Sequence, residues 1–179
     1  DVTDFYLEAK LWGSDLNSLA LLDKPKKAQI EYAQETLTWL GALDGDDKLT
    51  SRGRQLHGFG CHPRLANMLL EGKNSDDGTA QLACLLCALL EDKPIKELAN
   101  SVWLSEHVTF LLTSPKHTIW QHAKRWAKKL RVSLDQLMIR SSLQNIDNLL
   151  LAAFPDYVAR MRCEQYYQLV NGTGAKLAD

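Results

Sequence analysis

The sequence between residues 79 and 153 consists of helix-length segments joined by short polar connections, and this pattern limits the chain to a mainly helical fold. It predicts four helices, over 79–91, 95–113, 116–131 and 143–153. The apolar run from Leu82 to Leu90 is shorter than the roughly 20 residues that span a bilayer. We therefore interpret it as a core helix and expect no membrane partner. With 179 residues, 45% of them apolar, the chain is large enough to bury a core.

The first 70 residues predict four shorter helices, over 4–12, 25–40, 51–57 and 63–70. Between the second and the third, residues 42–44 and 48–50 are extended and the intervening Gly45-Asp46-Asp47 is typical of a hairpin turn. Thr50 is placed to cap the helix that begins at Ser51. The order helix, helix, hairpin, helix is typical of a winged-helix domain.

Near the end of the chain the apolar period changes to that of strands. Residues 158–163 and 165–170 are predicted to be extended, and a turn over Asn171-Gly172-Thr173-Gly174 precedes a third extended piece at 175–177. These strands have no predicted partner sheet, so we interpret them as the opening strands of an OB-like domain. The expected domains are a winged helix over 1–70, a ratchet-like helical bundle over 71–155 and the OB-like strands over 156–179. Because Asp1 replaces Met and the last residues lack a helical cap, we expect a piece of a longer protein.

Charge is distributed unevenly along the chain. Residues 1–100 carry 11 basic and 16 acidic side chains, a net charge of −5, whereas residues 101–179 carry 10 and 6, a net charge of +4. The second half is therefore the better candidate for a polyanion partner. Four cysteines without a signal peptide predict no disulfide framework and a reducing, cytoplasmic setting.

The segment 116–131 is the strongest candidate for binding. At 100° per residue, its apolar side chains gather on one side and its cations on the other, and it contains no acidic residue. The apolar positions are Ile119, Trp120, Ala123, Trp126, Ala127 and Leu130. The candidate nucleic-acid contacts are Lys124, Arg125, Lys128 and Lys129, then Lys116 and Arg131 at the segment ends, and Arg64 elsewhere. A solvated helix face is the alternative for the segment, and a structural ion pair is the favoured alternative for Arg64.

The sequence contains no convincing motif for a metal site or for a nucleotide-binding loop. Cys84 and Cys87 have metal-ligand spacing, but they lie in an apolar helix, and Cys61-His62 is the only plausible completion. Gly72-Lys73 lacks the upstream glycine and the Ser or Thr of a phosphate loop, and no Asp-Glu-Ala-His box occurs. We therefore expect neither a catalytic site nor a metal or cofactor in this chain.

Several short motifs carry a family resemblance in their order and spacing. They are Leu40-Gly41-Ala42-Leu43-Asp44, Leu49-Thr50-Ser51-Arg52-Gly53-Arg54, His62-Pro63-Arg64-Leu65-Ala66-Asn67-Met68-Leu69, the stretch from Leu149 to Arg160, and Asn171-Gly172-Thr173-Gly174-Ala175. This series resembles the C-terminal helicase-associated region of DEAH-box ATP-dependent RNA helicases of the bacterial HrpB type. The chain departs from that pattern at Gly58-Phe59-Gly60-Cys61, where the third helix is expected to end early, and at Cys163-Glu164, where a basic loop is in doubt.

The resemblance implies an accessory part of a helicase that guides nucleic acid. Its implied partners are single-stranded nucleic acid, RNA in preference to DNA, and the ATPase domains of the same polypeptide, which would hold ATP and magnesium. Two alternatives stay open. One is a free-standing winged-helix regulator that binds duplex DNA through Arg52, Arg54 and Gln55. The other is a module that binds only protein.

Overall fold

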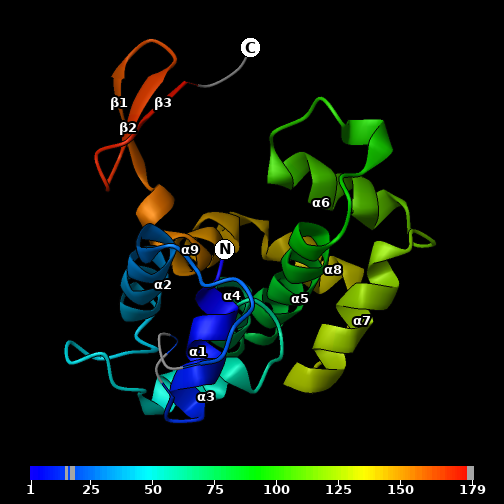
Figure 1. Cartoon of the computed structure of the whole chain (residues 1–179). Coiled ribbons are helices and arrows are strands. Elements are labelled where there is room, and N and C mark those ends of the chain that lie inside the picture. The colour runs from blue at the N-terminus through cyan, green and yellow to red at the C-terminus, as the bar shows by residue number, and fades with distance from the viewer. Residues whose placement is uncertain (15, 17–18, 177–179) are drawn as a thin grey trace. The chain divides into compact units, whose positions relative to one another are not determined.

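The computed structural model describes residues 1–14, 16 and 19–176, and helices dominate them (Figure 1). The predicted mainly α fold with a short β segment at the C-terminal end is confirmed. The α-helices are α1 (Thr3–Leu11), α2 (Lys27–Trp39), α3 (Ser51–His57), α4 (Pro63–Ser75), α5 (Asp77–Glu91), α6 (Leu104–Thr113), α7 (Ile119–Leu130), α8 (Gln136–Ser141) and α9 (Ile146–Ala153). The strands are β1 (Ala159–Cys163), β2 (Tyr166–Leu169) and β3 (Gly174–Lys176).

Contacts between Cα atoms group the chain into two compact units. One contains residues 1–66 and 150–179, and the other contains residues 67–149. The three predicted domain ranges, 1–70, 71–155 and 156–179, stay a prediction.

In the first unit, α1 packs against α2 and α3. The predicted hairpin between α2 and α3 is reduced to one antiparallel bridge, between Leu43 and Leu49. Thr50 caps α3 as predicted, since its Oγ1 accepts a hydrogen bond from the Gly53 amide at 3.0 Å. A Cβ atom on Gly53 would lie 2.4 Å from the Ala42 carbonyl oxygen, so only glycine allows this close approach. α3 ends at His57, the early end that was expected.

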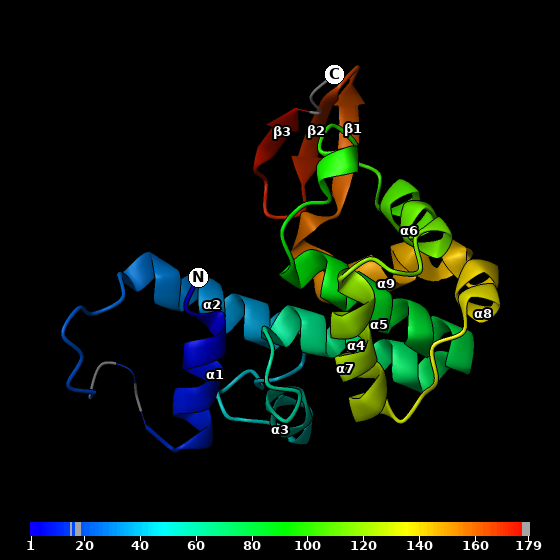
Figure 2. The same ribbon diagram turned by 90° about the vertical axis from the view of Figure 1, so that its right-hand side faces the viewer.

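The C-terminal strands form a sheet of their own, in the order β1-β2-β3 with antiparallel pairing (Figure 2). Each strand pairs with its neighbour along the chain, and this sheet contains no strand from elsewhere among the described residues. A bulge between Met161 and Cys163 shifts the register of β1 against β2. Gly172 has a φ of +85° in the predicted turn. Leu177, predicted to be extended, lies outside the described residues.

In the second unit, α4 continues to Ser75, five residues beyond its predicted end. Gly72 does not break the helix, because it is a packing position: a Cβ there would lie 2.6 Å from the Cβ of Ala83 on α5. α5 then begins after Asp76, whose side chain accepts from the Thr79 amide at 2.9 Å. Most of α5 is buried, and no helix among the described residues is long and apolar enough to cross a membrane.

Two further predictions in this unit were wrong. The predicted helix over 95–113 is a short 3₁₀ turn at Lys96–Leu98 followed by α6, with Val102 and Trp103 between them. The short helix α8 was missed, although Asp135 caps it through bonds to the amides of Leu137 and Met138, at 2.7 and 3.1 Å. An aspartate directly before a helix is a cap signal readable from the sequence.

Candidate nucleic-acid interface

Helix α7 packs along α5, and both views show the two helices side by side (Figures 1 and 2). The predicted apolar side is confirmed, because all six of its residues are buried. Trp126 is 1% exposed, and its Nε1 donates to a carboxylate oxygen of Glu91 at 3.2 Å. Trp120 donates from Nε1 to the Leu111 carbonyl oxygen at 3.2 Å. Two buried indoles with satisfied N–H groups therefore fix the rotation of α7 about its axis.

That rotation places the candidate cations in solvent. Lys124, Arg125, Lys128 and Lys129 are all exposed. Lys116 and Arg131 are exposed as well, but Lys116 lies before the first turn of α7 and Arg131 ends the helix in the left-handed region, with φ of +60°. The four helical cations, which we call the α7 cationic face, thus lie on one regular surface.

Arg125 is paired with a carboxylate that local sequence reasoning did not consider. Its Nη2 donates to Glu91 Oε2 at 3.0 Å, and its guanidinium carbon lies 4.5 Å from the Trp126 ring centroid. Asp92, the residue after Glu91, lies beside His122 of α7, with 3.3 Å between Asp92 Oδ2 and His122 Nδ1. The end of α5 therefore places two carboxylates against one edge of α7. Because the side chain of Arg125 is 61% exposed, this ion pair contributes little to stability.

Lys124 and Lys128 differ from Arg125 because neither forms an ion pair with a described carboxylate. Among the described residues, no carboxylate lies within ion-pair distance of either ammonium group. They are four residues apart, so they stand on neighbouring turns of the same side of α7. Lys129 lies 5.5 Å from the Trp126 ring centroid and has further interactions. Lys124 and Lys128 are therefore the members of the α7 cationic face for which no carboxylate partner is found among the described residues.

Arg64 lies in the other unit and is buried, and the structural ion pair favoured for it is confirmed. Its two terminal nitrogens donate to the two carboxylate oxygens of Asp156, at 2.6 and 2.7 Å. The same guanidinium donates to the hydroxyl of Tyr32 at 2.9 Å and to the carbonyl oxygen of Ala153 at 3.1 Å. Burial is the largest single influence on the pKa of Arg64 and lowers it, but the hydrogen bonds and charges of Asp156 and Tyr32 together outweigh burial, so the pKa is raised. We therefore leave Arg64 out of the contact surface.

The candidate recognition helix of the DNA-binding alternative is α3. Arg52 donates from Nε to the Leu40 carbonyl oxygen at 3.0 Å, which ties it to the end of α2. Arg54 and Gln55 are exposed. α3 has only seven residues, and one of its three candidate contact side chains is engaged, so it offers a small surface for reading base edges.

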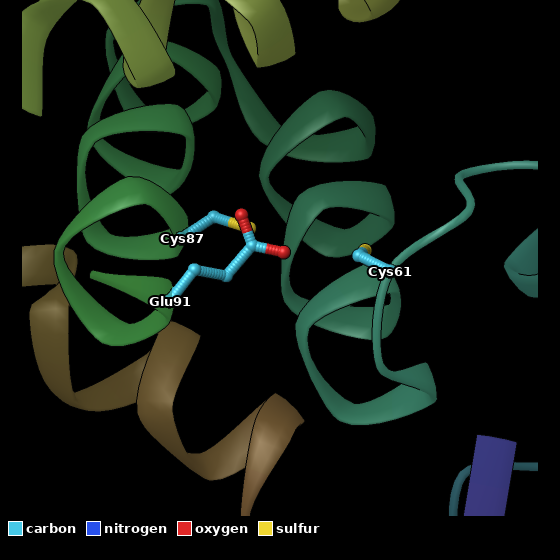
Figure 3. Close-up of side chains that lie close together, drawn as sticks. All are labelled: Cys61, Cys87 and Glu91. Atoms are coloured by element: carbon cyan, nitrogen blue, oxygen red, sulfur yellow. The ribbon is translucent and has the colours of Figure 1, made fainter.

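The cysteine pair on α5 behaves as core. Cys84 is fully buried, and burial raises the pKa of its thiol to about 12. A thiol with this pKa stays protonated near neutral pH, whereas metal binding needs the thiolate. Cys87 and Glu91 lie one turn apart on α5 (Figure 3). The Glu91 carboxylate already accepts hydrogen bonds from Arg125 and Trp126, both of which lie on α7.

This chain is similar in sequence and in structure to helicases of one kind, HrpB. No family model matches. The ATP-dependent RNA helicase HrpB of Escherichia coli (strain K12) is 34% identical over 99% of the chain. Two crystal structures resemble it as well: the E. coli DExH-box NTPase HrpB, with 31% identity over 99% of the chain and a TM-score of 0.73, and the E. coli DEAH/RHA helicase HrpB, with 30% identity over 98% and a TM-score of 0.74. The chain covers 20% of the first two proteins and 21% of the third, about a fifth of their length.

Proposed function

Because this chain corresponds to a C-terminal region of the HrpB-type helicases, we propose that it guides single-stranded nucleic acid past ATPase domains of the same polypeptide. In this proposal the ATPase domains bind ATP and magnesium, and the chain supplies backbone contacts and transmits their movement. RNA is the preferred strand, as the name of the curated relative suggests. Binding is expected to be nearly blind to sequence, because phosphates carry no base information.

One observation supports this proposal above the others: Lys124 and Lys128 stand unpaired on a helix whose rotation is fixed by buried tryptophans. A rigid helix holds its cations in place before a ligand arrives, so little side-chain order is lost on binding beyond the lysines themselves. Pairing of these lysines with phosphates would release counterions from the strand, which makes the affinity depend on salt.

Neutralising both lysines tests the proposal. Lys124→Gln combined with Lys128→Gln is expected to reduce the steepness of log K against log salt by about 1.4 for a single strand, since each phosphate contact contributes about 0.7. Binding at about 0.1 M salt should then weaken roughly 10- to 25-fold. The measurement is fluorescence anisotropy with a labelled oligonucleotide over a range of salt concentrations.

The matched control is Lys93→Gln combined with Lys96→Gln, which changes net charge equally at two exposed positions outside α7. This control should leave the slope close to that of the wild-type chain. Equal slopes for the two double variants would remove the α7 cationic face from the proposal. Binding to an ATPase domain with no affinity for RNA or DNA would select the protein-only module instead.

A substitution of Glu91 is expected to raise the affinity for the oligonucleotide, whereas the lysine substitutions lower it. Glu91→Gln keeps an oxygen for the Trp126 and Arg125 N–H groups but removes the charge that competes with phosphate for Arg125. Affinity for the same oligonucleotide should rise about threefold to fivefold at 0.1 M salt, with a salt slope steeper by about 0.7. An unchanged affinity and salt slope for Glu91→Gln would mean that Arg125 contacts no phosphate.

A further inference from the structure

Helix α2 in the first unit carries two exposed aromatic rings with a carboxylate between them. Tyr32, Glu35 and Trp39 stand at helical positions i, i+3 and i+7, so they share one side of the helix. Trp39 is 47% exposed and Tyr32 is 36% exposed, although aromatic side chains of this size usually dominate cores and interfaces. We call these three residues the α2 aromatic stripe.

The stripe borders a small hollow that is also lined by Thr36, Asp156 and Asn171. Its volume is about 40 Å³. A single water molecule needs roughly 10–15 Å³ of such space, so the hollow holds a few atoms and neither a nucleotide base nor a whole metabolite. It therefore fits the tip of one side chain, and the molecule that carries this side chain would lie outside, against the exposed rings of the stripe.

The charge of the stripe favours a positive group. Glu35 is exposed, and no lysine or arginine among the described residues forms an ion pair with it. The faces of tyrosine and tryptophan rings attract cations as well. Glu31, one turn earlier on α2, has the same sign of charge and pairs with Lys27 at 3.4 Å. Phosphate groups would be repelled here, so nucleic acid does not suit this surface.

The buried Arg64 does not meet this charge. Its two terminal nitrogens bind both oxygens of Asp156, so that pair is neutral as a whole. Its guanidinium carbon lies 5.8 Å from the ring centroid of Tyr32. Within the described part of the chain, no cation lies over the ring of Trp39. The charge of Glu35 and the ring of Trp39 are therefore open to a cation from another molecule.

We propose that the α2 aromatic stripe is a docking site for a partner protein, which places the ammonium group of one lysine against Glu35 and Trp39. Lysine suits the small hollow better than arginine, since an ammonium group is compact whereas a guanidinium is a wide planar fork. Exposed aromatic residues are enriched in protein interfaces, which agrees with a protein partner. This inference does not rest on the proposed function, because it concerns a different helix and a different class of partner.

The test is an NMR titration of the whole ¹⁵N-labelled 179-residue chain with the peptide acetyl-Leu-Lys-Leu-amide, at about 20 mM salt so that charges are weakly screened. The indole N–H signal of Trp39, assigned with Trp39→Phe, should shift and saturate. Replacing the lysine of the peptide by norleucine should weaken binding about tenfold, because both the ion pair and the contact with the ring are lost. Glu35→Gln should weaken it about threefold to fivefold. Asp23→Asn, at an exposed position of the same unit, is the charge-matched control and should bind like wild type.

The proposal would be overturned if the lysine peptide caused no saturable shift of the Trp39 signal. Equal binding of the norleucine peptide, or an unchanged affinity in Glu35→Gln, would overturn it as well. Butylammonium carries the same cation without a peptide and should bind about tenfold more weakly; an affinity equal to that of the peptide would mean that the hollow takes free amines and not a protein. An oligonucleotide that shifts the same signal would assign the stripe to nucleic acid instead. The dispersion of the amide signals checks that each variant keeps its fold.

Discussion

Replacing Arg64 by methionine is expected to lower the free energy of unfolding by about 3–5 kcal/mol, because it leaves the Asp156 carboxylate buried without its partner. The side chains of Arg64 and Asp156 are only 5% and 12% exposed, so water cannot take over the lost bonds. The aromatic rings of Phe154 and Tyr157, whose centroids lie 5.5 and 5.4 Å from the guanidinium carbon, would also lose their cation. Urea denaturation followed by circular dichroism measures the change.

A double variant separates the ion pair from simple loss of packing. Arg64→Met combined with Asp156→Leu removes both charges, and it should be less destabilised than either single variant, since no isolated charge remains buried. Additive losses in the double variant would show that the two residues act independently. A change below about 0.5 kcal/mol for Arg64→Met would mean that the buried ion pair makes no net contribution to stability.

The Arg64 pair also shows what the sequence could not reveal. Both partners lie in motifs that carried the family resemblance, His62-Pro63-Arg64 and Pro155-Asp156-Tyr157, and an ion pair was the favoured role for Arg64. The sequence gives no sign, however, that a residue 92 positions away supplies the carboxylate. A partner at that separation is set by tertiary packing, which local periodicity does not encode.

Helix α7 shows the opposite case. Its six buried positions follow from the 3.6-residue period alone, because an amphipathic helix with one apolar stripe has one way to pack. The ion pair between Arg125 and Glu91 does not follow from the segment 116–131, because Glu91 comes from α5, 34 positions away in the sequence. The end of α4 was missed for a related reason: Gly72 has the residue type of a helix break, and its close contact with Ala83 exists only in the fold.

Replacing Trp126 by alanine is expected to cost about 3–5 kcal/mol of stability, the usual range for deleting a buried aromatic ring. The indole is 1% exposed between α7 and α5, and its removal would leave a cavity that two packed helices cannot fully close. It would also leave Glu91 without one of its two donors. Chemical denaturation of the variant measures the loss.

Two further variants show which property of Trp126 matters. Trp103→Ala removes the same side chain at a position that is 62% exposed in the same unit, and it should change stability by less than about 0.5 kcal/mol. Trp126→Phe retains an apolar ring but cannot donate to Glu91, so its cost should be nearer 1 kcal/mol. If burial of this ring fixes the direction of the lysines, Trp126→Ala should also flatten the salt dependence of strand binding under conditions where it remains folded. A folded Trp126→Ala chain with the wild-type salt slope would mean that the orientation of α7 is set by its other contacts.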